Sequence, residues 1–183
     1  IAGVGASYGG SLGISLGQIT NDDFVVAQIE NSTITVGSDS SGSSIDVVAS
    51  DSRYMETKVW VTSIAIAIGG AAAGGHSFIY SQPIVIAEVG HGSQIKPKND
   101  SHRSDLSVIA TGQESVHAGI FGGVAGLVAI GDFIAETDKH GIVGAAIGTV
   151  ATLKVGNLTV NAFGDHDLDA HGWSLGGGAL SIS

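Results

Sequence analysis

Hydrophobic and polar residues alternate along several stretches of this chain, and that pattern predicts β-strands. Ile34-Thr35-Val36 and Ile45-Asp46-Val47 place apolar and polar side chains on opposite faces, as a strand with one wetted face does. No stretch shows a convincing helical period of apolar residues. The pattern therefore predicts an all-β protein.

A second alternation pairs large apolar residues with small ones. Between Ser63 and Ile68 isoleucine alternates with alanine, so both faces of this strand are apolar but only one is bulky. We expect the isoleucines to pack in a core and the alanines to face outward, where a second surface can approach closely.

Two short phrases recur and indicate an internal repeat. Ala27-Gln28-Ile29 is followed 60 residues later by Ala87-Glu88-Val89, and then by Ala151-Thr152-Leu153. A second phrase recurs at Ala49, Ala110 and Ala162. Its spacing is 61 and then 52 residues, so the third repeat is the shorter one.

The repeats predict a single repetitive all-β domain over residues 1–183. Its parts are a partial lead-in, two full repeats of about 60 residues and a shortened third repeat. They cover residues 1–20, 21–80, 81–140 and 141–183.

The chain also ends on the phrase with which it began. Gly9-Gly10-Ser11-Leu12-Gly13-Ile14-Ser15 returns as Gly177-Gly178-Ala179-Leu180-Ser181-Ile182-Ser183. Unpaired strand edges recruit further strands, so equivalent ends would let the last strand of one subunit precede the first strand of the next. Excision from a longer array would leave the same echo. We predict self-association into a homo-oligomer or polymer through Gly9, Leu12, Ile14, Gly177, Leu180 and Ile182.

The order of these phrases and of the glycine–alanine blocks at 64–75 and 119–131 resembles the repetitive exoprotein regions of bacterial haemagglutinin, leukotoxin-like and autotransporter adhesins. The resemblance implies a right-handed parallel β-helix, or β-solenoid, which acts as a stalk, adhesive surface or filament subunit. Coils of roughly 20 residues would make each repeat about three coils. An antiparallel β-sandwich or β-prism is the alternative, since threefold glycine-rich repeats also occur there.

Composition and charge narrow the range of partners. Seven basic and seventeen acidic side chains give a formal net charge of −10, which repels nucleic acid and anionic membrane surfaces. The sequence has no cysteine, so disulfides and thiolate metal sites are excluded. The most apolar runs, 64–73 and 118–131, fall short of the ~20 residues of a membrane-spanning helix. We expect no membrane-spanning segment.

Candidate chemistry is sparse. Asp165, Asp167 and Asp169 alternate along one segment, so their carboxylates would project to one side and form a candidate site for Ca²⁺. The seven histidines lack a His-x-x-x-His pairing, and no other cofactor is indicated.

Two further residue classes bear on surface function. Asn31, Asn99 and Asn157 begin acceptor sequons for N-glycosylation. The aromatic residues form no evident sugar-stacking ladder in the sequence, and we expect Trp60 and Trp173 to fill core gaps or turn corners.

The sequence thus predicts a non-enzymatic, extracellular or cell-surface protein that self-associates into a filament, stalk or surface layer, with a cell-surface glycan as a candidate partner. One alternative is a polysaccharide lyase or epimerase of β-helix type, using the segment 165–171 with a basic residue such as Lys154. Another is a lectin-like carbohydrate-binding module.

Overall fold

The computed structural model describes residues 1–37, 43–66 and 68–182. Within them the chain forms strands and no helix that could span a membrane. The strands are β1 (Ala2–Ser7), β2 (Ser11–Asn21), β3 (Phe24–Ile29), β4 (Thr33–Val36), β5 (Ser44–Ala65), β6 (Gly70–Ser81), β7 (Ile84–Val89), β8 (Gln94–Pro97), β9 (Asp105–Ala125), β10 (Val128–Lys139), β11 (Ile142–Ile147), β12 (Thr152–Leu153), β13 (Leu158–Gly177) and β14 (Leu180–Ile182).

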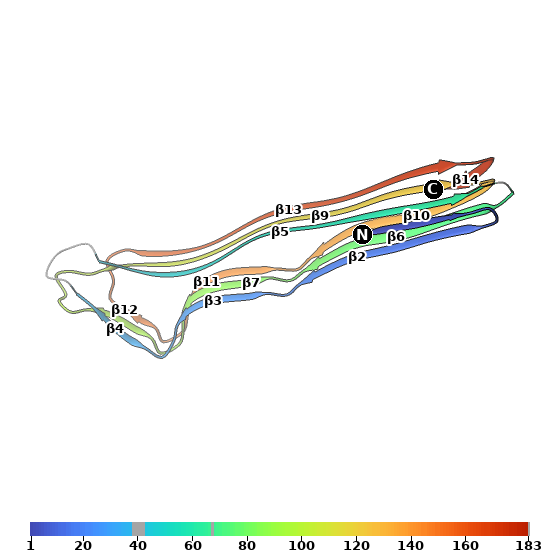
Figure 1. Cartoon of the computed structure of the whole chain (residues 1–183). Helices are drawn as coiled ribbons and strands as arrows, with labels where there is room; N and C mark the ends of the chain where they lie inside the picture. The colour runs from blue at the N-terminus through green and yellow to red at the C-terminus, as the bar shows by residue number, and fades with distance from the viewer. Residues whose placement is uncertain (38–42, 67, 183) are drawn as a thin grey trace.

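The strands form four parallel sheets in which each strand pairs with the one four places earlier. We name them sheet A (β1-β5-β9-β13), sheet B (β2-β6-β10-β14), sheet C (β3-β7-β11) and sheet D (β4-β8-β12). The chain runs along sheets B, C and D and returns along sheet A, and then repeats this circuit (Figure 1). We call the strands of one circuit, one in each sheet, a row. The predicted all-β fold is confirmed, and its parallel sheets are compatible with a β-helix. Because every pairing among the described strands is parallel, the antiparallel alternative is wrong.

The strand register tests the repeat alignment. Ala49, Ala110 and Ala162 share one column of sheet A, which confirms the second phrase and its shortened last interval. Ala27 and Ala87 pair in sheet C, but the next residue in that column is Ala145, so the alignment with Ala151 was wrong. The missing residues come largely from the connection that leads into β13. In register, Ile95 lies 11 positions before Leu106, whereas their partners Leu153 and Leu158 are only five positions apart.

One repeat makes one circuit of the fold, and the expected three coils per repeat is wrong. The reason is strand length, because β5 has 22 residues and β9 has 21. A single return strand therefore spans the whole length of sheets B and C (Figure 1).

The interior changes in width along the circuit. Where sheet A covers sheet C, the core contains full-sized apolar residues such as Val85, Val89 and Leu106. Where β5 and β9 turn into β6 and β10, which we call the narrow end (residues 59–75 and 118–135), many inward residues are alanine or glycine. The buried alanines there are Ala65, Ala71, Ala73, Ala118 and Ala129.

At the narrow end the expected orientation of the isoleucines is reversed. Ile64, Ile66 and Ile68 face outward, 45%, 51% and 91% exposed, while Ala65 is buried. Glycine contacts give the physical reason. A Cβ on Gly13 would lie 2.8 Å from the Thr62 carbonyl oxygen, and one on Gly75 would lie 2.7 Å from a methyl of Ile120. The two sheets approach so closely that Val61 and Ile120 of sheet A must face glycine or alanine on sheet B, and near the turn the small Ala65 faces inward.

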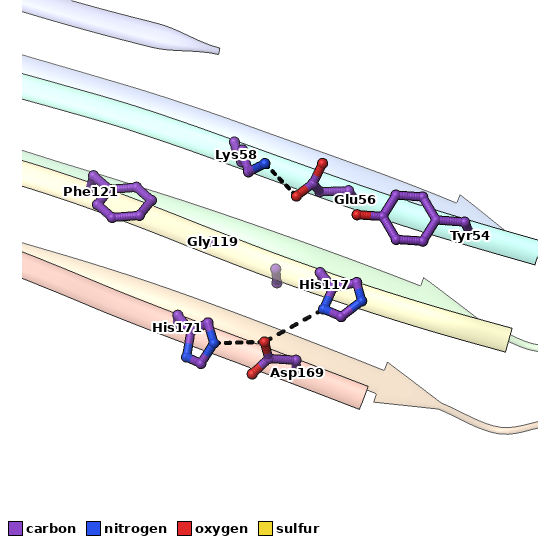
Figure 2. A pocket seen from close by; sticks show the side chains of 9 residues that line it. Tyr54, Glu56, Lys58, His117, Gly119, Phe121, Asp169 and His171 are labelled. Atoms are coloured by element: carbon purple, nitrogen blue, oxygen red, sulfur yellow. Dashed lines mark ion pairs between the residues drawn. The ribbon is translucent and has the colours of Figure 1, made fainter. Parts of the chain in front are cut away.

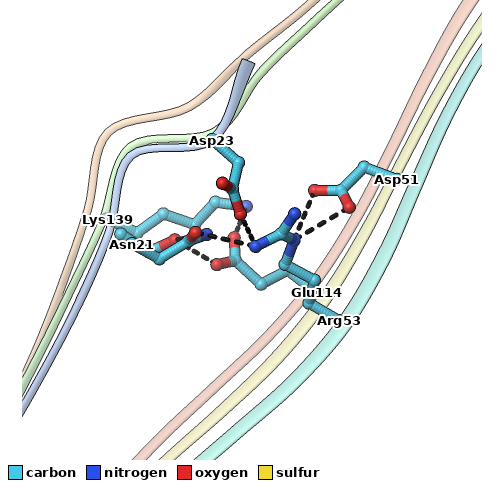
Figure 3. Close-up of polar contacts among 7 residues, drawn as sticks. Asn21, Asp23, Asp51, Arg53, Glu114 and Lys139 are labelled. Atoms are coloured by element: carbon cyan, nitrogen blue, oxygen red, sulfur yellow. Dashed lines mark hydrogen bonds and ion pairs between the residues drawn. The ribbon is translucent and has the colours of Figure 1, made fainter. Parts of the chain in front are cut away.

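A stripe of polar side chains crosses the interior where sheet B passes into sheet C (Figure 3). Arg53 donates to Asn21 Oδ1 at 2.8 Å and to both carboxylate oxygens of Asp51, and it forms an ion pair with Asp23. Burial raises the pKa of the Asp51 carboxyl, and the neighbouring Glu114 carboxylate raises it further. Since ionised Asp51 is disfavoured in the fold, its contribution to stability falls as pH rises above 3.8.

The same stripe continues on β9 and β10, where it contains a buried ion pair. Lys139 Nζ lies 2.7 Å from Glu114 Oε2, and the two side chains are 8% and 3% exposed. Ser81 Oγ donates to the same carboxylate, and Lys139 also donates to His166 Nδ1. The stripe separates the apolar cluster around Val85 from the clusters of the narrow end.

The close approach at the narrow end predicts opposite effects for two glycines on β9. A Cβ on inward-facing Gly122 would overlap the Phe133 ring, whereas one on outward-facing Gly119 has its nearest neighbour at 3.6 Å. Gly122→Ala should lower the free energy of unfolding by about 1–3 kcal/mol. Gly119→Ala should change it by less than about 0.5 kcal/mol. Urea unfolding measures both, and equal effects would contradict the assigned facing.

The buried ion pair predicts a second effect on stability. Lys139→Met leaves the Glu114 carboxylate buried without its cation, which should cost about 3–5 kcal/mol of unfolding free energy. Adding Glu114→Gln should recover most of this loss, because the uncompensated charge is gone. Chemical denaturation of the three variants tests it, and a Lys139→Met protein as stable as the parent would refute the pairing.

Candidate functional site

The outer face of sheet A carries the densest group of chemically active side chains. Residues in register on β5, β9 and β13 lie side by side, so one residue from each repeat contributes to every column. Neighbouring columns on this face are Tyr54–Ser115–Asp167, Glu56–His117–Asp169, Lys58–Gly119–His171, Trp60–Phe121–Trp173 and Thr62–Gly123–Leu175.

A hollow of about 180 Å³ lies over Gly119, because this position lacks a side chain between Lys58 and His171 (Figure 2). Lys58 Nζ pairs with Glu56 Oε1 at 2.5 Å. The Lys58 hydrogen bond lowers the pKa of the Glu56 carboxyl, and the Glu56 hydrogen bond raises the pKa of Lys58. Both groups are therefore ionised at neutral pH.

Two imidazoles converge on one carboxylate at the other side of the hollow. His171 Nε2 lies 2.6 Å and His117 Nδ1 lies 3.5 Å from Asp169 Oδ2. The Tyr54 ring is tilted against the His117 ring, with centroids 5.4 Å apart. The hollow thus presents hydrogen-bond donors and acceptors from all three strands (Figure 2).

Ser115 extends this line of side chains, since its Oγ lies 2.8 Å from His117 Nε2. Serine, histidine and aspartate then stand in the order of a nucleophile, its base and an orienting carboxylate. Acyl transfer also needs donors aimed at a developing oxyanion. The backbone N–H groups of paired strands lie in the plane of the sheet, so β9 and β13 aim none outward beside Ser115.

An aromatic column borders the hollow. The Trp60 and Phe121 rings stack at 4.6 Å with a 17° interplanar angle, and Trp173 follows in the same column. A second hollow, of about 260 Å³, lies over Gly123 and is walled by Trp60, Phe121, Trp173 and Leu175. Trp60 is 55% and Trp173 is 70% exposed, so the prediction that they fill core gaps was wrong. Strand alternation explains this, because Trp60 lies between the inward-facing Val59 and Val61, and Trp173 shares its column.

The predicted calcium ligands all lie on the outer face of β13. Alternate residues of a strand are about 6.5 Å apart, which spreads Asp165, Asp167 and Asp169 along the strand instead of around one point. No group of three His, Cys, Asp or Glu side chains within residues 1–37, 43–66 and 68–182 is arranged to hold a metal ion. Calcium binding remains a prediction.

The structure does not bring Lys154 to the segment 165–171. Lys154 follows β12 at the opposite end of the circuit, where its Nζ lies 4.0 Å from Asp100 Oδ1 (Figure 1). The choice of Lys154 as the basic partner is therefore wrong, whereas Lys58 lies in the column of His171 and Lys139 contacts His166.

The three sequon asparagines lie in connections outside the strands. Asn31 has a positive φ of 46°, and its N–H donates to the His91 carbonyl. Asn99 Oδ1 accepts a bond from the Ser101 N–H. Asn157 donates to Asp105 Oδ1 through both its backbone N–H, at 2.8 Å, and its side-chain amide, at 3.0 Å. The acceptor nitrogen of the third sequon is thus engaged in a structural hydrogen bond.

Four of the six predicted self-association residues lie on outer strands of sheet B, whereas Gly9 lies in the turn before β2 and Gly177 ends β13 in sheet A. Leu12 and Ile14 project outward from β2, and Leu180 and Ile182 from β14, at opposite edges of that sheet. Ile182 falls in the column of Leu12, whereas the sequence echo aligned it with Ile14. The shift of two residues keeps the same face outward. Ser183, the last residue of the echo, lies outside the described residues.

Comparison with family models, with curated proteins and with solved structures finds no match for this chain.

Sequence reasoning singled out Asp169 and His171 within the segment 165–171 but missed their partners on β5 and β9, although a signal for them was present. Trp60, Phe121 and Trp173 are separated by 61 and then 52 residues, the same intervals as the alanine phrase. Glu56, His117 and Asp169 have the same spacing. Extending the alanine register along the strand would have placed each set in one column.

The Asp105–Asn157 contact predicts a measurable titration. The Asn157 backbone N–H, followed by its side-chain amide, lowers the pKa of Asp105 below its ordinary value of 3.8. Asp105 therefore stabilises the fold above that pH, and the contribution is lost as pH falls through the lowered pKa. Asn157→Ala should raise the Asp105 pKa part of the way back, followed by NMR of the carboxyl carbon. Asn99→Ala is the control, and an unchanged Asp105 pKa in Asn157→Ala would contradict the contact.

Proposed function

We propose that this chain is a non-enzymatic, extracellular structural protein of β-solenoid type, whose circuits continue into a second copy to build a filament, stalk or surface layer. The observation that supports it is that the described strands at both ends of the stack of rows have an unpaired edge. Within the described residues, β2, β3 and β4 have a strand neighbour on one side, and so do β11, β12, β13 and β14.

The end rows also leave core side chains half covered. At one end Val25, Ile29 and Ile34 are partly buried against the core, and at the other end Val143, Ile147 and Leu153 are. A further row on either end would bury these side chains and pair the free backbone groups. Burial of these apolar side chains and pairing of the strand edges both favour recruitment of another row.

A second copy can supply that layer by a shift of three rows along the stack. Its β3 would then lie beside β11 and its β4 beside β12, which continues sheets C and D. Its β2 would occupy the place of β14, and its own β1 would give way to the β13 of the first copy. The displaced strands are β14, with three residues, and β1, with six, so their displacement breaks few hydrogen bonds. This is strand exchange between subunits.

Proline on the open edge of β2 tests the assembly. The Gln82 N–H donates to the Asn21 carbonyl, so odd-numbered residues of β2 direct their backbone groups to β6. The Leu12 amide therefore points to the open edge, where proline removes a donor for a neighbouring copy without breaking the β2–β6 ladder. We expect the parent chain to form concentration-dependent oligomers in sedimentation velocity, and Leu12→Pro to remain monomeric.

Leu12→Ala is the matched control, because it shortens the same side chain and keeps the amide. It should assemble like the parent chain. A parent chain that stays strictly monomeric at rising concentration, with and without Ca²⁺, would refute the proposal. Equal loss of assembly in both variants would place the contact on the outer side chain instead of the strand edge.

A further inference from the structure

Two hollows lie in line on the outer face of β9, one on each side of Phe121. Their floors are Gly119 and Gly123, which are four residues apart and hence about 13 Å apart along the strand. Each hollow has less than the ~300 Å³ at which small-molecule pockets begin. A ligand must therefore span both hollows to bury much surface, which favours an extended molecule over a single ring.

The hollows differ in chemistry. The one over Gly119 is lined by charged and polar groups, among them Glu56, His117, Asp169 and His171, which can accept and donate hydrogen bonds to hydroxyl groups. The one over Gly123 is walled by the indoles of Trp60 and Trp173. Flat apolar rings beside planar hydrogen-bonding groups match a pyranose, which has an apolar C–H face and a rim of hydroxyls.

Charge decides which kind of saccharide fits. Asp165 and Asp167 lie on the same face of β13 as Asp169, and Lys58 is neutralised by its pair with Glu56. The chain as a whole has a net charge of −10. Uronic acids, sialic acids and sulfated sugars would meet repulsion here, whereas a neutral sugar would not.

We propose that the outer face of sheet A binds a neutral oligosaccharide that lies along β9 across Phe121, with one end in each hollow. Binding uses side chains of all three repeats, because each column takes one residue from β5, β9 and β13. It uses no strand edge, so it is independent of the assembly proposed above.

Tryptophan fluorescence gives a direct readout, since both tryptophans of the chain lie in this aromatic column. The chain is first applied to an array of neutral linear oligosaccharides with sialylated and uronic acid counterparts. The neutral sugar that binds is then titrated against the emission spectrum. We expect binding to neutral members, with a shift in emission. Absence of any neutral ligand, or preference for the acidic counterparts, would overturn the proposal.

Variants locate the site. Trp173→Ala removes an exposed indole and should lower affinity about tenfold or more. Gly119→Val fills the first hollow and should also abolish binding, while its Cβ meets no atom closer than 3.6 Å. Gly144→Val, on the outer face of sheet C where nothing lies within 4 Å of the new Cβ, is the matched control and should bind normally.

The outcomes separate cleanly. Full binding by Trp173→Ala and Gly119→Val would overturn the proposed site, as would loss of binding in Gly144→Val. Circular dichroism confirms the fold of each variant, and Trp173→Ala still decides the question if Gly119→Val fails to fold. Leu12→Pro should bind the sugar like the parent chain, whether or not the parent assembles.

Discussion

The close approach of sheets A and B at the narrow end is the constraint from which most other features follow. Sheet B must carry glycine or alanine at its inward positions there, because Val59, Val61 and Ile120 of sheet A fill the space between the sheets. Near the turn, where Ala65 faces inward, its neighbour Ile64 lies on the outer face. Trp60 lies outward because it alternates with the buried Val59 and Val61, and Trp173 lies in the same column.

The polar stripe lies between the narrow end and the wider apolar core under sheet C. A buried pair such as Glu114 with Lys139 costs desolvation free energy that the ion pair offsets only in part. Its position between two apolar clusters gives it a second role, since the partners must face each other for the rows to align. A slip by one residue would turn Glu114 and Arg53 outward and leave their partners inside without compensation. The stripe therefore fixes the register of the long strands.

Period-two alternation and the alanine phrase predicted the strands, the repeat and its shortened last interval, because these depend on local pattern alone. The direction in which Ile64 and Ala65 face could not be predicted, since it depends on the distance between two sheets. Likewise, the hollow over Gly119 depends on what the strands on either side carry in the same column. Sequence alone shows this only after the repeat register has been established and followed across all three copies.

The one-repeat-per-row register has a consequence for how such a molecule changes over evolutionary time. Duplication of a unit of about 60 residues inserts one complete row in every sheet and leaves the rows above and below in register. Each event lengthens the stack by about 4.8 Å and adds one residue to every column. Length and surface chemistry can thus diverge separately, the first by copying whole units and the second by point substitution at outward positions.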